Sequence, residues 1–349
     1  MPFTPLPNTA LSATVVSKAE IYTYAQAYNS EIIEIAGKLT GSPETYVLSD
    51  DDELGIGLTK RTGSAPAKRF TPLASVYSDN HRFVFYVDDD NYLRDVYYNN
   101  GRWQAGDLYN KRWKCAPYSK LAAIRLTNPA GYNFVCLYYQ DTAATGDIRL
   151  VNRNPHGWAE GLPPLNDPPL YGTSLAVVPP EPGIEVRTES GTYDTKDAVL
   201  FFQYDRLELG SSQDQGDKDY ATYSIGDKTK ALSAQASIAA VDDGTNFWAF
   251  YTSDNNQIQQ LRVAKDGVTI QPRPVVLDAT PIPRSALAAV LVPGSSSSST
   301  DKIVLFYLLH YESFKQTSQE VNIFANTLSA QTQPATDAWG ISKRVCLTE

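Results

Sequence analysis

Four side chains stand out among those in the sequence that could donate or accept protons in an enzyme. His310 and Tyr311 stand together in "LLHYES" after an apolar run, while Glu34 and Asp95 lie in the more polar segments "EIIEIAG" and "YLRDVYY". Imidazole, phenol and carboxyl groups act as general acids and bases, or as donors to a developing oxyanion. These four residues are therefore the candidate catalytic groups, although a lone histidine beside an apolar strand is more often structural.

Signatures of metal, nucleotide and nucleophilic chemistry are absent from the sequence. It has no GxSxG, HExxH or P-loop, and no GxGxxG between a strand and a helix. The acidic runs "SDDDE" (49–53) and "DDDN" (88–91) lack the alternating ligands and the glycine of a calcium loop, so we interpret them as turns. Cys115, Cys136 and Cys346 show no metal or redox spacing and are expected to be buried small apolar residues. We predict neither a metal nor a cofactor.

Composition and charge narrow the class of protein. Of the 349 residues 42% are apolar and 20% charged, which favours a packed core, and the 22 tyrosines favour β-structure. The net charge of −9 argues against a nucleic-acid partner, and no apolar run reaches the length of a membrane span. The first residues, "MPFTPLPNTALSATVV", lack the pattern of a signal peptide, so the expected location is cytoplasmic by default. The sequence leaves open whether the protein forms a homodimer.

One structural unit recurs along the chain. A short segment of small and branched residues appears six times, as "LSAT", "LASV", "LAAI", "LAVV", "IAAV" and "LAAV", which start at residues 11, 73, 121, 175, 238 and 287. Each is followed by an aromatic-rich apolar segment, at 21–26, 83–88, 135–140, 199–204, 248–253 and 304–309. A more polar third segment follows in five copies, at 31–37, 92–98, 147–153, 257–263 and 320–326. Trp103, Trp158 and Trp339 mark a fourth segment in three copies.

These repeats predict an all-β fold, a six-bladed β-propeller of four-stranded antiparallel blades. Turn residues such as "NNG" and "SDNN" separate the segments, and no segment has a sustained helical period, so we expect few helices. The small first strands suit the crowded axis. We predict one domain over 1–349, with blades at roughly 8–50, 70–118, 119–170, 171–235, 236–284 and 285–349. A pair of β-sandwiches would not explain one repeated order of segments.

The fourth repeat departs most from the others. It carries "PPEPGIEVRTESGTYDTKD" between its first two segments and the polar stretch "SSQDQGDKD" after "RLELG". Long insertions in a regular repeat usually form loops on one face, where they either serve function or are simply tolerated. We interpret "GSSSSST" (294–300) as a flexible loop.

The unit "FVFYVDDDNYLRDVYYNNGRW" (83–103) resembles a blade of the fungal fucose-specific lectins, six-bladed propellers of the Aleuria type. In that family each blade reads approximately R-V-Y-Y-Q, a turn, I-R-E and then a tryptophan. The resemblance implies that the arginine, glutamate and tryptophan would bind fucose between adjacent blades. Charged hydrogen bonds would fix the hydroxyl groups, and the aromatic ring would pack on the apolar side of the sugar.

Transferred position by position, this triad is incomplete. The place of the arginine is taken in the six copies by Tyr22, Phe83, Cys136, Val199, Trp248 and Val304. The glutamate persists as Glu34 and, shortened, as Asp95, whereas Leu150 and Gln260 stand there in the third and fifth copies. The resemblance therefore implies a scaffold that has lost its sugar-binding charge, and we expect fucose binding at these positions to be abolished.

The replaced positions make the predicted clefts apolar and aromatic, either because they became core or because they bind an apolar ligand. The second case resembles fungal hetero-Diels–Alderases, which join a tropolone o-quinone methide to a humulene-type sesquiterpene. That resemblance implies a cofactor-independent pericyclase in meroterpenoid biosynthesis, with a terpene and an aromatic or tropolone partner as substrates. The predicted substrate-binding residues are Tyr22, Phe83, Trp103, Trp158, Trp248 and Gln260.

Two other functions stay open at this point. The protein could be a lectin with one or two residual sites near Glu34 or Trp103, or a non-catalytic propeller that docks another protein. The sequence also leaves open whether a ligand would lie in the axial tunnel or in a cleft between blades.

Overall fold

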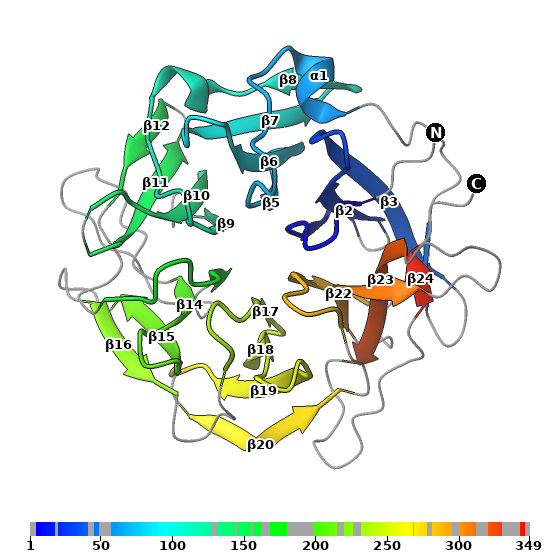
Figure 1. The fold of residues 1–349 in the computed structure, drawn as a ribbon, viewed down its shortest axis with the longest axis vertical. Coiled ribbons are helices and arrows are strands. Elements are labelled where there is room, and N and C mark those ends of the chain that lie inside the picture. Colours follow the sequence, from blue (N-terminus) through cyan, green and yellow to red (C-terminus); the bar gives the residue numbers. More distant parts are fainter. Residues whose placement is uncertain are drawn as a thin grey trace.

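A computed structural model shows the chain as a ring of small β-sheets around a central axis (Figure 1). The structure describes residues 5–17, 20–40, 45–48, 57–127, 131–143, 145–154, 156–161, 168–179, 198–214, 220–225, 232–267, 269–277, 281–294, 301–311, 320–329 and 343–345. Strands dominate these ranges, and the fold is an all-β propeller with four-stranded antiparallel blades.

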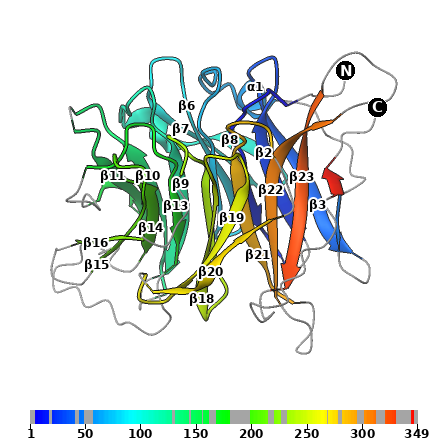
Figure 2. The same cartoon turned by 60° about the horizontal axis from the view of Figure 1, so that its bottom comes forward.

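The described strands form six four-stranded sheets, each with its strands in chain order. We number the sheets one to six along the chain. Their first strands surround the axis (Figure 1; Figure 2). These innermost strands are β1 (Ser12–Val15), β5 (Ala74–Ser78), β9 (Leu121–Thr127), β13 (Ala176–Val178), β17 (Ile238–Asp242) and β21 (Leu287–Val292).

The second strands are the most apolar because a neighbouring sheet covers each of their faces. All seven residues of β18 are buried, as are all but the first residue of β6 and of β10. The second strands are β2 (Glu20–Gln26), β6 (His81–Val87), β10 (Asn133–Gln140), β14 (Val199–Gln203), β18 (Asn246–Thr252) and β22 (Lys302–Tyr311).

The outer two strands of each sheet complete the fold. The third strands are β3 (Ile32–Thr40), β7 (Leu93–Asn99), β11 (Ile148–Asn154), β15 (Leu209–Asp214), β19 (Ile258–Ala264) and β23 (Glu320–Ser329). The fourth strands are β4 (Thr45–Leu48), β8 (Arg102–Ala105), β12 (Gly157–Glu160), β16 (Tyr220–Ser224), β20 (Ile270–Val276) and β24 (Lys343–Val345).

The apolar core is divided among the spaces between neighbouring sheets. One cluster joins Tyr24 of sheet one to Tyr86 of sheet two, and another joins Ile21 of sheet one to Phe306 of sheet six. The last sheet therefore packs against the first, which closes the ring. Burial of side chains this large supplies most of the stabilisation of the fold.

A repeated side-chain hydrogen bond ties each innermost strand to the strand beside it. In five sheets a hydroxyl just before the innermost strand accepts a backbone N–H from the second strand. The pairs are Thr9–Gln26, Thr71–Val87, Ser119–Gln140, Thr173–Gln203 and Ser285–Leu308, with distances of 2.6–2.9 Å. These bonds satisfy a donor that lies beyond the end of the sheet ladder.

The small, aromatic and polar strands lie at the positions that the sequence repeat predicts, but the third strand of the fourth sheet differs from the prediction. The stretch "SSQDQGDKD" was interpreted as an insertion, yet its first four residues belong to β15. Ser211 and Ser212 are buried there, and the Ser211 hydroxyl donates to the carbonyl of Gly267 at 2.7 Å. The insertion at 180–197 and most of "GSSSSST" lie outside the described residues.

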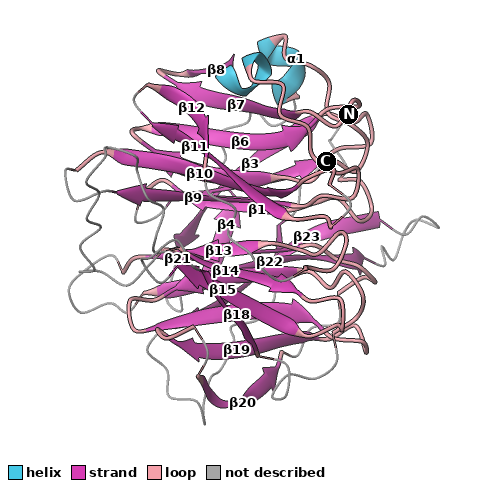
Figure 3. Cartoon of the chain, turned by 90° about the vertical axis from the view of Figure 1, so that its left-hand side faces the viewer, coloured by secondary structure: helices cyan, strands magenta, loops and turns pink. Residues whose placement is uncertain are grey.

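Helices are few in the described ranges, as predicted. A five-residue helix, α1 (Leu58–Thr62), lies at the edge of sheet two beside β7 and β8, and a short 3-10 turn spans Asp107–Asn110 (Figure 3). The run "DDDN" forms the predicted turn, in which the N–H of Asn91 donates to the carbonyl of Asp88. No helix in the described part of the chain is long and apolar enough to cross a membrane.

Candidate functional site

The cleft between sheets one and two contains an ion pair whose partners come from both sheets. Glu34 lies on β3, and Arg82 lies on β6 of the next sheet. Arg82 Nε donates to Glu34 Oε2 and Arg82 Nη2 donates to Glu34 Oε1, each at 3.1 Å. The phenol of Tyr24, directly opposite Glu34 in the ladder, donates to Oε2 at 2.8 Å. This fork geometry is the strong form of an arginine–carboxylate contact.

Aromatic rings enclose the guanidinium group of Arg82. Its carbon lies 3.9 Å from the ring centre of Tyr22 and 4.0 Å from that of Tyr98, so the cation stands between two rings. Trp103 closes the third side at 5.6 Å and also meets the edges of Tyr98 and Tyr24. A cation held over several aromatic faces is attracted by their quadrupoles.

Burial and charge set the ionisation of this cluster. The side chains of Arg82 and Glu34 are only 10% and 18% exposed. Burial alone would lower the pKa of Arg82, but Tyr24 and Glu34 beside it raise that pKa overall. Burial, reinforced by Glu34, raises the pKa of Tyr24 well above its usual value, so this phenol stays a donor. The cleft is therefore charged, hydrogen-bonded and aromatic.

Three predicted residues, Tyr22, Glu34 and Trp103, come together in this cleft. Arg82 was missed, and the expectation that the cleft had lost its charge is wrong. Residues 82, 84 and 86 of β6 face sheet one, whereas Phe83, at the family's arginine position, faces sheet three. The arginine thus comes from the facing wall of the cleft. The alternation of side chains along a strand is the signal that could have found it.

The cleft between sheets two and three brings together three other predicted residues, Phe83, Asp95 and Trp158, but it is packed shut. Trp158 meets the edge of Phe85, and a Cβ on Gly106 would lie only 2.0–2.2 Å from the Asp95 carboxyl group. The absence of that Cβ lets the segment after β8 close over Asp95.

A buried carboxyl group in this second cleft has an unusual proton affinity. The N–H of Leu108 donates to Asp95 Oδ1 at 3.0 Å, and Asp95 is 4% exposed. Burial raises the pKa of Asp95 to about 7, although the Leu108 N–H and the nearby Arg153 both act to lower it. Without access to solvent, Asp95 is positioned as part of the core rather than as a ligand contact.

The remaining predicted residues do not join one site. Trp248 is fully buried, and its Nε1 donates to Asp243 Oδ2 at 2.7 Å, while Gln260 is buried opposite Phe250. His310 and Tyr311 end β22, but their side chains lie outside the described part of the structure, as does Trp339.

Glu34 and Asp95 lie in different clefts, so these two carboxyl groups do not form an acid pair. The strand pairing also identifies the residues equivalent to Glu34 in the fourth and sixth sheets, which the sequence alone did not assign. They are Ser211 and Ala325.

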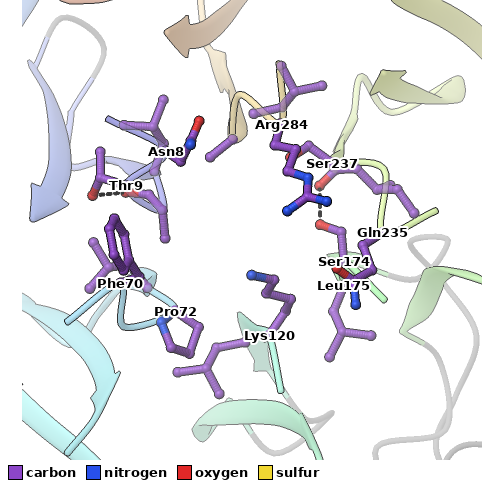
Figure 4. Close-up of a pocket in the computed structure, with 17 residues that line it drawn as sticks. Asn8, Thr9, Phe70, Pro72, Lys120, Ser174, Leu175, Gln235, Ser237 and Arg284 are labelled. Atoms are coloured by element: carbon purple, nitrogen blue, oxygen red, sulfur yellow. Dashed lines mark hydrogen bonds between the residues drawn. The ribbon is translucent and has the colours of Figure 1, made fainter. Parts of the chain in front are cut away.

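A hollow also lies on the axis, where the six innermost strands begin (Figure 4). Its volume is about 330 Å³, and its walls combine aliphatic side chains with polar ones, among them Lys120 and Arg284. No group of three or more histidine, cysteine, aspartate or glutamate side chains in the described ranges could hold a metal ion.

Known proteins share this architecture. The family model described as fungal fucose-specific lectin matches residues 51–308. A fucose-specific lectin of Aspergillus oryzae is 30% identical over 154 residues, which is 43% of this chain and 45% of that protein. The match therefore spans less than half the length of that relative.

Solved structures agree on the fold. A structure of AofleA from Arthrobotrys oligospora has a TM-score of 0.70 at 15% identity and covers 100% of this chain and 89% of that one. The six-bladed propeller of Aleuria aurantia lectin has a TM-score of 0.69 at 18% identity and covers 98% and 97%. These likenesses concern the fold, whereas the family match covers most of the sequence. The chain belongs to the fungal fucose-specific lectin family.

Proposed function

We propose that the protein is a glycan-binding lectin whose remaining sugar site is the cleft lined by Glu34, Arg82 and Trp103. The observation that carries this proposal is the arginine–glutamate fork beside Trp103. Tyr22 occupies the family's arginine position in this cleft, and Arg82 supplies the positive charge from the neighbouring sheet instead. Fucose is the first sugar to test, because the family is one of fucose-specific lectins.

The cleft offers the two kinds of contact that a sugar needs. Glu34 oxygens can accept hydroxyl donors, and the guanidinium N–H groups not bonded to Glu34 can donate to ring or hydroxyl oxygens. Tyr22 and Tyr98 are half-buried and form the accessible walls, against which the apolar side of a sugar can pack. Because the charged pair is mostly covered, a sugar must reach it past these two rings. We therefore expect weak affinity, in the millimolar range.

Calorimetric titration with methyl α-L-fucoside tests this function. The wild-type protein should bind, Glu34→Gln should lose binding, and Trp103→Phe should weaken it. Asp95→Asn is a matched control because it replaces a carboxyl group by an amide in the next cleft, which is packed shut. Thermal unfolding of each variant confirms that it is folded. Absence of any binding by the wild type, or equal binding by Glu34→Gln, would count against the proposal.

A cofactor-independent hetero-Diels–Alderase is the second candidate function. The favouring observation is the axial hollow, which combines aliphatic walls with two cationic donors, Lys120 and Arg284. Such a site could hold a terpene and polarise a tropolone oxygen. Against it, about 330 Å³ lies near the lower end of the range for small-molecule pockets, roughly 300–1,000 Å³, and this reaction needs two partners at once.

Incubation with a hydroxymethyl tropolone precursor and humulene separates the two candidates. An enzyme of this class would form adducts faster, or with different stereochemistry, than a protein-free control. If the protein and the protein-free control give the same adducts at the same rate, the enzymatic function is excluded for these substrates. Catalytic roles for His310, Tyr311, Glu34 and Asp95 belong to this second candidate alone.

We also infer that the six sheets are the blades of one six-bladed propeller domain over residues 1–349. The supporting contacts are the core clusters between successive sheets, including the one that joins sheet six to sheet one. A crystal structure with more or fewer than six blades around the axis would contradict this inference.

A further inference from the structure

The axial hollow has a regular wall of aliphatic side chains. Each of the six innermost strands contributes one leucine or isoleucine at its start or immediately before it. These residues, the aliphatic ring, are Leu11, Leu73, Leu121, Leu175, Ile238 and Leu287. All six are buried, so the ring forms an apolar surface that faces the hollow.

One residue earlier in each repeat, a second set of six residues also lines the hollow. Five of its members are small or compact, and the sixth is a lysine: Ala10, Pro72, Lys120, Ser174, Ser237 and Ala286. The repeat therefore makes Lys120 an exception, because its long cationic side chain occupies a position where every other sheet leaves space.

Arg284 approaches the same space from the opposite wall. Lys120 precedes β9 of sheet three and Arg284 precedes β21 of sheet six, and both side chains point into the hollow (Figure 4). None of the described residues that line the hollow is an aspartate or a glutamate. Among the described ion pairs, none includes Lys120 or Arg284. Two cations thus meet without a carboxylate in a chain whose net charge is −9.

The electrostatic surroundings of Lys120 also favour an anion in the hollow. Lys120 is an exposed residue whose side chain lines the hollow. Burial, together with the positive charges of Lys68 and Arg284, lowers the pKa of Lys120. Every one of these influences disfavours the charged amine, and an anion in the hollow would reverse that balance.

The rim adds an aromatic surface held at a conformational cost. Phe70 has a φ of 59° and its side chain is 49% exposed, although bulky residues avoid this left-handed region. The side-chain oxygen of Gln26 accepts its N–H at 2.7 Å and fixes the turn. The turn thereby places an accessible ring at the mouth, beside the aliphatic ring.

We propose that the axial hollow binds a small organic anion, with its carboxylate between Lys120 and Arg284 and its apolar part against the aliphatic ring. The volume of about 330 Å³ suits one molecule of this class. Charge-assisted hydrogen bonds from two cations give the site its preference for an acid, and aliphatic burial gives it affinity. This site is separate from the proposed sugar cleft, so either can be correct without the other.

Calorimetric titration with 2-naphthoate and its neutral analogue 2-naphthamide tests the proposal at low salt. The acid should bind at least tenfold more tightly than the amide, because only the acid carries a negative charge to pair with the two cations, and tenfold corresponds to about 1.4 kcal/mol. Lys120→Gln and Arg284→Gln should each weaken naphthoate binding about tenfold and leave naphthamide unchanged. Lys38→Gln is the matched control, because it removes the same charge from an exposed site on β3.

Both cationic side chains are solvent-accessible, so their substitution should leave the thermal unfolding midpoint near that of the wild type. Equal affinity for acid and amide would overturn the proposal, as would no heat of binding with naphthoate. It would be equally overturned if Lys38→Gln weakened binding as much as Lys120→Gln did.

Discussion

Arg82 and Glu34 meet across two neighbouring sheets through two nitrogen–oxygen contacts of 3.1 Å each. Their side chains approach from opposite walls of one cleft, and Tyr22 and Tyr98 cover the guanidinium group on both sides. The pair therefore joins sheets one and two as well as forming the polar part of the candidate site. Its contribution to stability can be separated from its contribution to binding.

Breaking this pair from one side should destabilise the fold. Arg82→Met keeps much of the side-chain volume but leaves Glu34 largely buried with Tyr24 as its remaining hydrogen-bond donor. We expect a loss of about 3 kcal/mol in the free energy of unfolding, measured by urea denaturation. The double variant Arg82→Met/Glu34→Gln should recover part of that loss, and strictly additive effects in the cycle would contradict coupling.

Asp95 should make stability fall as the pH rises. Its pKa in the folded protein is about 7, above the ordinary value of 3.8, so the folded state holds the proton more tightly than the unfolded chain. The stabilisation from this group is complete below the unfolded pKa and is lost as pH rises through about 7. The total change is on the order of 4 kcal/mol between those limits.

Urea denaturation at several pH values measures this effect. Asp95→Asn keeps an oxygen for the Leu108 N–H and removes the titration. The difference in unfolding free energy between this variant and the wild type should grow in favour of the variant from pH 4 to pH 8. A difference that does not vary with pH would refute the shifted pKa of Asp95.

Gly106 should not tolerate a methyl group while Asp95 is present. A Cβ at this position would lie within 2.0–2.2 Å of the Asp95 carboxyl atoms, and the backbone φ of −90° is itself unstrained. We expect Gly106→Ala to lower the thermal unfolding midpoint because of this clash. The double variant Gly106→Ala/Asp95→Ala should be less impaired than the sum of its two single variants. Simple additivity would show that the close approach is not the cause.

Trp248 should act on stability rather than on ligand binding. The side chain is fully buried among sheets five and six and bonds Asp243, so Trp248→Ala removes a large core group. We expect a cost of about 3–5 kcal/mol in urea denaturation. Trp248→Phe should cost less, and it should bind methyl α-L-fucoside as the wild type does. Weaker sugar binding by the folded Phe variant would reinstate this cleft as a site.

The repeat predicted the strands well because their physical environments differ. Small residues such as those of "LAAV" fit the axis, and aromatic runs such as "WAFYTS" fit the space between sheets, so composition alone separates the two strands. The polar strand β15 could not be predicted in this way. Ser211 and Ser212 are buried but carry no apolar signal, and only the ladder shows their place.

The candidate site was predicted in part. Glu34 and Trp103 were found because they keep the family's positions, whereas Arg82 was not, because it stands one residue before the expected place and faces the other way. Neither its partner nor its contact with two tyrosine rings follows from a single repeat. They depend on how two repeats pack, which requires the three-dimensional arrangement of neighbouring sheets.

The central claim is that the cleft between sheets one and two is a sugar site, and a crystal structure of the protein with methyl α-L-fucoside tests it most directly. We predict sugar density against Tyr22 and Tyr98, with a hydroxyl within hydrogen-bond distance of Glu34 or Arg82. Sugar bound only at other clefts, or no sugar in this cleft at concentrations that saturate binding in solution, would contradict the account.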